Sequence, residues 1–218
     1  LIDEKAEDVD RLYKRFRQQQ TEYGGEVTPA DKKALQDRLK KLNDELNILL
    51  ARQYAIHNPK GKEYEAWLKS HTPLHWFVEF YGIVNNGGFD VIIGNPPYIE
   101  YVKVKGKYRV VESAYSCLPC GNLYAFVIER SLRLGRNGAR LGMIVQLSAV
   151  CTDRMEPLQA AYQRACDKVW ASCYDDRPGK LFDGLEHIRA TILLSHQAQI
   201  ERTEIRATNL LRWYSEDL

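Results

Sequence analysis

One ten-residue stretch, Phe89–Tyr98 (FDVIIGNPPY), constrains the fold more than any other part of the chain. Its apolar run contains three consecutive β-branched residues, Val91, Ile92 and Ile93, which predict a strand buried on both faces of a sheet. Gly94 ends the run. The two prolines that follow remove two backbone donors and fix φ twice, so neither a strand nor a helix can continue. A rigid loop therefore follows the strand at its carboxyl end, the edge at which open α/β sheets bind ligands.

The residue types in this loop suit one chemical task. The side-chain oxygen of Asn95 and the carbonyl of Pro96 are two acceptors that a proline-stiffened loop can hold still. A planar exocyclic amine is a poor nucleophile because its lone pair is delocalised into the ring, and two acceptors against its N–H groups return electron density to the nitrogen. Tyr98 offers a flat face for stacking, worth roughly 1–3 kcal/mol per base. The pattern favours attack by such an amine on a methyl sulfonium, with positioning and preorganised dipoles in place of a metal or a covalent intermediate.

The tetrapeptide Asn95–Tyr98 after a hydrophobic strand resembles the catalytic motif of amino-methyltransferases that use S-adenosylmethionine. Together with the preceding segments His75–Phe80 (HWFVEF) and Gly87–Asp90 (GGFD), it is similar to one branch of them. That branch is the gamma-class adenine-specific DNA methyltransferases, many of which are fused to a nuclease in type IIG restriction–modification enzymes. The resemblance extends from about His71 to the end of the chain.

This resemblance implies an α/β fold, a partial doubly wound (Rossmann-like) methyltransferase sheet preceded by an α-helical hairpin. It implies methyl transfer from S-adenosylmethionine to an adenine flipped out of double-stranded DNA, with Asn95, Pro96, Pro97 and Tyr98 as the catalytic residues. In the family an aromatic residue before a late strand sandwiches the extruded base with the motif tyrosine. Phe182 holds the matching position here, although a phenylalanine at such a place is more often part of a core.

Three other functions stay open at this stage. Protein-glutamine methyltransferases share the tetrapeptide, although the helical hairpin and the size of the implied parent enzyme count against them. Cytosine N4 methylation uses related chemistry, but a serine commonly replaces the asparagine in that group. The chain could also be a catalytically silent DNA-binding or scaffold fragment with a vestigial pocket.

A basic segment follows the motif. Four cations alternate with tyrosines and valines in Ile99–Arg109, a pattern that suits a loop lying along a phosphate backbone. The alternative is an ordinary solvated surface, because the formal net charge of the chain is only +2. The candidate DNA-backbone residues are Lys103, Lys105, Lys107 and Arg109.

The chain is expected to have three parts. Residues 1–70 contain apolar residues at helical spacing on both sides of Gly24–Gly25, and Thr28–Pro29 has the pattern of a helix start, so an antiparallel helical hairpin is predicted. This hairpin is an insertion packed on a neighbouring domain or, alternatively, a site of oligomerisation or nuclease attachment. Residues 71–198 are the catalytic half of a methyltransferase domain. Residues 199–218 begin a connection to a target-recognition region.

Periodicity and turn residues predict the remaining elements of the catalytic half. Helices are expected at Glu63–Ser70, at Gly121 to about Leu134 with Val127 on its buried side, and at Glu156–Cys166. A turn is expected at Gly135–Gly138, and strands at Leu141–Val145, Lys168–Tyr174 and Ala190–Ser195. The family usually has a proline after the strand Leu141–Val145, whereas this chain has Gln146.

The chain lacks one feature that these methyltransferases normally carry. No strand followed by a glycine-containing cofactor loop precedes Phe89, and none is found near the end of the chain. We therefore expect a piece of a larger enzyme, the catalytic half without the cofactor half. S-adenosylmethionine would be used by the full-length parent, and the isolated chain would be inactive.

Composition bounds the remaining possibilities. No run of 18 apolar residues or signal peptide is present, so a soluble protein of the bacterial cytoplasm with no membrane partner is expected. The five cysteines are expected to be reduced. Cys117/Cys120 and His71/His75 have spacings seen in metal sites, but each lacks further ligands, and no metal is expected.

Overall fold

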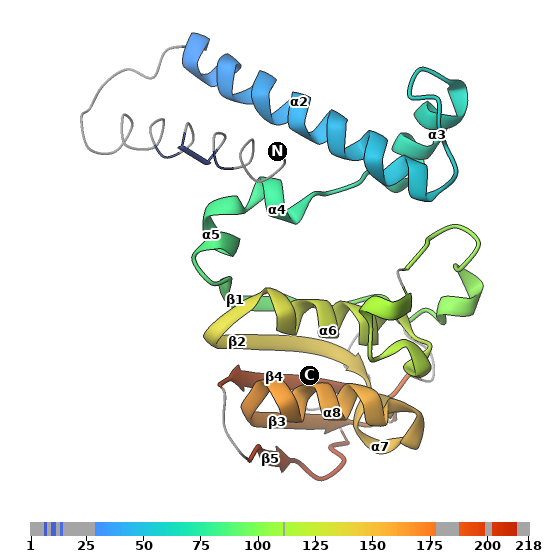
Figure 1. Cartoon of the computed structure of the whole chain (residues 1–218). Coiled ribbons are helices and arrows are strands. Elements are labelled where there is room, and N and C mark those ends of the chain that lie inside the picture. Colours follow the sequence, from blue (N-terminus) through green and yellow to red (C-terminus); the bar gives the residue numbers. More distant parts are fainter. Residues whose placement is uncertain are drawn as a thin grey trace. The chain divides into compact units, whose positions relative to one another are not determined.

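The computed structural model describes residues 7, 10, 11, 14, 29–110, 112–177, 188–198 and 202–212 of the chain (Figure 1). The chain divides into two compact units, Leu1–Asn86 and Gly87–Leu218, and each is described here by itself. None of the described helices is both long and apolar enough to cross a membrane.

The first unit is helical. It contains α2 (Pro29–Gln53), α3 (Lys62–His71), α4 (Trp76–Glu79) and α5 (Tyr81–Asn85). α2 begins at Pro29 as predicted, and the short helix predicted at Glu63–Ser70 is confirmed, whereas the predicted cap Thr28 lies outside the described residues. Tyr64 and Trp67 of α3 pack with Ala51 and Ile56 in a small core. The glycine turn and most of the first helix of the predicted hairpin lie outside the described residues.

The second unit is built on a five-stranded mixed sheet. Its strands are β1 (Phe89–Gly94), β2 (Gly135–Gln146), β3 (Cys166–Tyr174), β4 (Ala190–Gln197) and β5 (Glu204–Ala207), in the spatial order β1-β2-β4-β3-β5. Strand β1 pairs parallel with β2, β4 is antiparallel to both β2 and β3, and β5 is parallel to β3. The predicted α/β class is confirmed.

Helices connect these strands and cover one face of the sheet. The second unit contains α6 (Leu123–Leu134), α7 (Ser148–Cys151) and α8 (Glu156–Ala165), and four short 3-10 turns at Tyr101–Lys103, Glu112–Ala114, Leu118–Cys120 and Asp153–Met155. Figure 1 shows α6 and α8 on the same side of the strands, and their buried side chains form one core with alternate residues of β2, β3 and β4. α6 begins where the side chain of Asn122 accepts a hydrogen bond from the Tyr124 amide (3.4 Å), a helix cap.

The prediction that the motif strand is buried on both faces is wrong for the described structure. Val91 and Ile93 are 53% and 81% exposed. The cause is the placement of both long helices, α6 and α8, on the opposite face, where Ile92 packs against the core. Among the described residues of this unit, no helix covers the face that carries Val91 and Ile93.

Three local predictions also differ from the structure. The predicted turn Gly135–Gly138 is the start of β2, because Gly135 pairs with Phe89 before the register shifts and Val91 pairs with Arg140. Val127 was expected on the buried side of α6 but is 39% exposed, since it faces away from the sheet. Strand β5 was not predicted, because its four residues are all exposed and carry no burial pattern.

Candidate functional site

The motif asparagine lies at the carboxyl end of β1. Gly94 is the last residue of the strand and pairs with Met143 of β2. Asn95 follows it and is exposed, Pro96 is buried and Pro97 is exposed. The Asn95 amide forms no hydrogen bond with any part of the chain that the structure describes, so its oxygen can accept one from a ligand. Asn95 also lines an open hollow of about 1070 Å³ on the uncovered face of the sheet.

The motif tyrosine is fixed at its hydroxyl end. The Tyr98 hydroxyl donates to the carbonyl of Ile144 (3.1 Å), which ties the motif loop to the neighbouring strand β2. Its ring meets the ring of Tyr124 edge to face, with centroids 6.3 Å apart at an interplanar angle of 89°. Burial raises the pKa of Tyr98, so the phenol stays neutral. The ring is half-buried, and an anchored aromatic ring of this kind loses little entropy when a second ring stacks on it.

The segment that follows the motif is hydrogen-bonded to the residues at the start of α6. The Leu123 amide donates to the Ile99 carbonyl (2.9 Å), and the Tyr101 amide donates to the Gly121 carbonyl (2.7 Å). Between these two contacts, Arg154 forms an ion pair with Glu100 (Nη2 to Oε2, 2.6 Å). Sequence reasoning missed Glu100 and Arg154 because they are 54 positions apart and no local pattern links them.

A buried carboxylate of α6, that of Glu129, holds the segment that precedes this helix. Glu129 accepts hydrogen bonds from the amides of Ser116 (3.0 Å) and Cys117 (2.8 Å), and it also pairs with Arg133. Burial alone would raise the pKa of Glu129, but the hydrogen bonds from Cys117 and Ser116 outweigh it and bring this pKa to about 2. The carboxylate is therefore ionised and holds the segment before α6 in place. It too was not singled out from the sequence.

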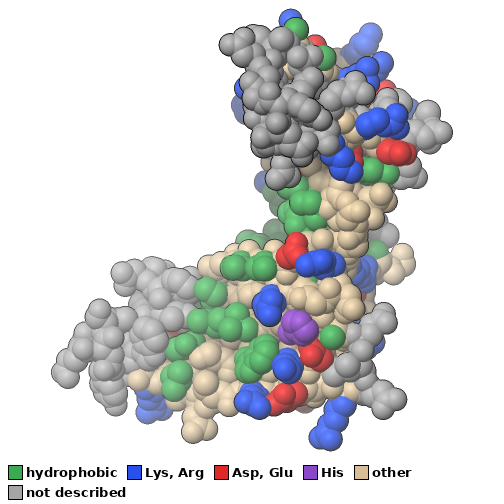
Figure 2. All heavy atoms as spheres, turned by 90° about the vertical axis from the view of Figure 1, so that its left-hand side faces the viewer, with side chains coloured by type: hydrophobic (Ala, Val, Ile, Leu, Met, Phe, Trp, Pro, Cys, Tyr) green, Lys and Arg blue, Asp and Glu red, His purple; other side chains and the backbone are tan. Residues whose placement is uncertain are grey.

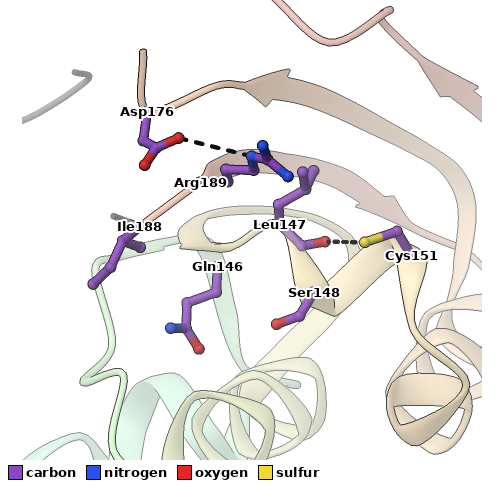
Figure 3. A pocket seen from close by; sticks show the side chains of 7 residues that line it. All are labelled: Gln146, Leu147, Ser148, Cys151, Asp176, Ile188 and Arg189. Carbon is purple, nitrogen blue, oxygen red and sulfur yellow. Dashed lines mark hydrogen bonds and ion pairs between the residues drawn. The ribbon is translucent and has the colours of Figure 1, made fainter. Parts of the chain in front are cut away.

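A second pocket, of about 440 Å³, lies at the carboxyl edge of the sheet (Figure 3). It is lined by the end of β2, the residues after it, the residue pair before β4, and Asp176 after β3. The lining residues are Gln146, Leu147, Ser148, Cys151, Asp176, Ile188 and Arg189. Gln146, which stands where the resemblance led us to expect a proline, lines this pocket. Since Tyr98 binds the carbonyl of Ile144, this pocket begins two residues beyond that contact along β2.

Arg189 beside this pocket is oriented by a buried carboxylate. Its Nε donates to Asp175 (3.0 Å), and Asp175 also accepts from Arg212 (3.1 Å). The backbone amide of Asp176 and the Arg189 side chain lower the pKa of Asp175 to about 2, and burial opposes them.

The four candidate DNA-backbone cations lie together on one exposed segment. They occupy a 3-10 turn and the turns after it, with Val104 packed against the core below them. Lys105 forms an ion pair with Glu112 (2.8 Å), and the Lys107 ammonium lies 5.3 Å from the ring centroid of Tyr108. The exposed members of the set are Lys103, Lys105, Lys107 and Arg109.

The other candidate residues either are buried in the fold or lie outside the described residues. Phe182, the proposed second stacking residue, is outside the described residues. Cys117 and Cys120 are free thiols with no exposed surface. No cluster of three or more His, Cys, Asp or Glu side chains that suits a metal ion is found in the described ranges.

Comparison with known proteins places this site in a family. Residues 5–169 match the Eco57I restriction-modification methylase family. The chain belongs to that family, as the motif and its flanking residues indicated.

Individual proteins match the chain over only part of its length and at limited sequence identity. Over 92 residues the chain is 34% identical to a protein of Methanocaldococcus jannaschii whose name proposes a type II restriction enzyme and methyltransferase. The match covers 42% of this chain and 7% of that protein, so the chain spans a small part of its relative. Among solved structures it is similar to DrdV in complex with DNA (14% identity, 62% of this chain and 16% of that chain, TM-score 0.47). It is also similar to the type ISP restriction-modification enzyme LlaGI with a DNA substrate mimic (16% identity, 60% and 15%, TM-score 0.43).

Proposed function

We propose that the chain is the catalytic half of a site-specific DNA adenine N6-methyltransferase that uses S-adenosylmethionine, part of a larger restriction–modification or phage-defence enzyme. One observation carries the proposal. In a member of this methylase family, the Asn95 amide stands exposed and without a described hydrogen-bond partner at the end of a strand, three residues before an anchored tyrosine ring.

The residues of this chain would act by positioning. The adenine, rotated out of the duplex, would place its amino group between the Asn95 oxygen and the Pro96 carbonyl. Both acceptors would draw electron density onto the amine nitrogen as it forms its new bond to carbon. Tyr98 would hold the ring by stacking, and Phe182 would stack on its other side. Pro97, with Pro96, would keep the acceptors from moving.

S-adenosylmethionine, when bound, supplies the methyl carbon. The described part of the chain has no strand with a glycine-containing loop before β1. We therefore assign the main cofactor contacts to a part of the parent enzyme other than residues 1–218. On this account the isolated chain binds the cofactor weakly and transfers no methyl groups.

Membership of a restriction–modification methylase family favours DNA over a protein glutamine as the substrate. Asn95 in place of the serine common among cytosine methyltransferases favours adenine.

Methyl transfer can be measured with S-adenosylmethionine labelled in its methyl group. We expect the full-length parent to label duplex DNA and not added protein, and the isolated 218-residue chain to label neither. Label in protein glutamine would contradict the proposed substrate. Label transferred to DNA by the isolated chain would contradict its assignment as an incomplete half.

Two substitutions of Tyr98 separate its two contacts. Tyr98→Phe removes the hydrogen bond to the Ile144 carbonyl and keeps the stacking ring, so we expect a loss of about 1 kcal/mol in stability and little loss of methylation. Tyr98→Ala removes the ring, and we expect methylation by the parent enzyme to fall by about 5- to 150-fold, the equivalent of 1–3 kcal/mol. Equal methylation by the two variants would show that the ring does not stack on the base.

The basic segment after the motif can be tested through the salt dependence of DNA binding. Removing one phosphate contact lowers the slope of log K against log salt by about 0.9. We expect Lys103→Ala and Lys107→Ala each to reduce the slope by about that amount in the parent enzyme, measured by fluorescence anisotropy on a duplex. Lys60→Ala, an exposed lysine of the helical unit, is the control and should leave the slope unchanged. Unchanged slopes for all three variants would remove these cations from the DNA interface.

A further inference from the structure

Backbone hydrogen bonds hold the segment after the motif on both sides of Glu100. On one side the Ile99 carbonyl accepts from the Leu123 amide (2.9 Å). On the other side the Tyr101 amide donates to the Gly121 carbonyl (2.7 Å). These two bonds enclose a single isolated bridge between the two segments. Strand pairing as short as this is marginal by itself in water, so side chains at the bridge must help to hold it.

Arg154 supplies such a side-chain contact, because it reaches both oxygens of the Glu100 carboxylate. Its Nη1 donates to Oε1 (3.3 Å) and its Nη2 donates to Oε2 (2.6 Å). Two parallel bonds of this kind need the planar fork of an arginine, which a lysine does not have. The Asn122 side chain, which caps α6, also donates to Oε1 of this carboxylate (3.5 Å). Glu100 therefore joins the segment after the motif to the start of α6 and to the 3-10 turn Asp153–Met155.

A glycine leaves the space that the arginine occupies. Gly121 has a φ of +64°, a conformation in which a residue with a Cβ is strained. A Cβ added at Gly121 would also lie 2.1 Å from Nη2 of Arg154, so the guanidinium would have to move away from Glu100. The bridge beside the motif is therefore shaped to admit this arginine, which comes from a part of the chain 54 residues beyond Glu100.

The residue after Arg154 supports the motif tyrosine by another route. The sulfur of Met155 accepts a hydrogen bond from the Tyr124 hydroxyl (3.4 Å). The ring of Tyr124 in turn meets the Tyr98 ring edge to face. Two consecutive residues of one turn thus reach the motif region, Met155 through the aromatic pair and Arg154 through Glu100.

Solvent exposure separates the effect of this ion pair on folding from its effect on the site. The side chains of Arg154 and Glu100 are 51% and 36% exposed, and exposed ion pairs contribute little to the free energy of unfolding. A displacement of about 1 Å at a reacting group can nevertheless reduce a rate by about 100-fold. A pair that fixes the motif should therefore affect the reaction more strongly than it affects the stability of the fold.

We propose that Glu100 and Arg154 are positioning residues for the methyl transfer, an inference that rests on the function proposed above. Neither residue contacts the adenine. Arg154 holds Glu100, and Glu100 fixes the backbone two residues beyond Tyr98. With this segment fixed, the Tyr98 ring and the Asn95 oxygen keep their places against the base. Without the ion pair the segment moves, and the base is held less often in the geometry that reacts.

Single-turnover methylation by the full-length parent tests the positioning role. We expect Arg154→Ala and Glu100→Ala each to lower the rate at saturating DNA by about 10- to 100-fold, with DNA affinity unchanged. The double variant should be no slower than the slower single variant, because the two residues act as one unit. Arg154→Lys keeps the charge without the fork and should fall between the wild type and Arg154→Ala. Arg206→Ala, which removes the exposed ion pair with Glu204 on β5, is the matched control and should react at the wild-type rate.

Three outcomes of this experiment would overturn the proposal. Wild-type rates in both alanine variants would show that the pair does not position the motif. Loss of DNA affinity in Arg154→Ala alone, with Glu100→Ala unaffected, would make the arginine a phosphate contact. A purely structural pair would lower the melting temperature by more than about 4 °C and leave the rate unchanged well below it.

Hydrogen exchange in the 218-residue chain tests the same ion pair without using methylation. The amides of Tyr101 and Leu123 report on the bridge, since each donates one of its two hydrogen bonds. We expect both amides to exchange at least about tenfold faster in Arg154→Ala and Glu100→Ala, with the amides of β2 and β4 unchanged. Unchanged exchange at the bridge would overturn the proposal. Faster exchange together with a wild-type parent that methylates no DNA would contradict the proposed reaction and leave the support of the segment by this pair established.

Discussion

Replacing Asn95 by alanine in the full-length parent is expected to reduce DNA methylation by about 100- to 1000-fold, the usual effect of removing one preorganised group from a catalytic site. The reason is that the Asn95 oxygen is one of only two acceptors proposed to hold the reacting amine. Asn95 is exposed and forms no hydrogen bond with a described residue, so the substitution should not change the melting temperature. The measurement is the rate of methyl transfer to duplex DNA, with DNA affinity measured in parallel.

The control for this experiment is Val102→Ala. Val102 is 78% exposed in the segment after the motif and has no assigned contact with the adenine, so its variant should methylate normally. If Asn95→Ala retained full methylation, the asparagine would have no catalytic role. If it lost DNA binding and methylation together, the residue would serve binding and not the chemical step.

Replacing Glu129 by alanine is expected to lower the free energy of unfolding of the 218-residue chain by about 3–5 kcal/mol. The buried carboxylate accepts hydrogen bonds from the amides of Ser116 and Cys117, and its removal leaves the buried Cys117 donor without its partner. The measurement is urea denaturation. Glu112→Ala is the matched control, because Glu112 forms an exposed ion pair with Lys105 that should contribute less than about 1 kcal/mol. Equal losses for the two variants would contradict the structural role of Glu129.

The same carboxylate makes stability depend on pH in a defined direction. The pKa of Glu129 is about 2 in the folded chain and near its ordinary 4.5 in the unfolded chain, so the group stabilises the fold at every pH above the unfolded value. That difference corresponds to about 3 kcal/mol, which is lost as the pH falls from about 5 to 2. The stability gap between the wild type and Glu129→Ala should therefore shrink by about this amount over that range. A gap that did not change with pH would mean that the carboxylate is not stabilised by its hydrogen bonds.

The local patterns of the sequence predicted most of the elements because each is set by neighbours in the chain. The β-branched run predicted β1, Pro29 predicted the start of α2, and the apolar spacing after Asn122 predicted α6. The predictions that were wrong concern features that depend on residues far apart in the sequence. The exposure of Val91 and Ile93 follows from the placement of α6 and α8 on a single face, which no strand pattern encodes.

In the candidate site, too, the features set by local sequence were predicted and those set by distant residues were not. Asn95 and Tyr98 were found because they stand in one short motif with a recognisable chemistry. The residues that position that motif come from distant parts of the chain, and none of them has a local signature. They are the Ile144 carbonyl that accepts from Tyr98, the Glu100–Arg154 ion pair, and Glu129 of α6, which holds the segment before that helix.

The central claim is that an amide oxygen and an anchored ring prepare the amino group of an adenine for methylation. The most direct test is to incubate the full-length parent with S-adenosylmethionine and duplex DNA, digest the DNA to nucleosides and identify the methylated product by mass spectrometry. The account predicts N6-methyladenine in the wild type and its loss in Asn95→Ala. N4-methylcytosine, or no methylated base from an enzyme that binds both substrates, would contradict it.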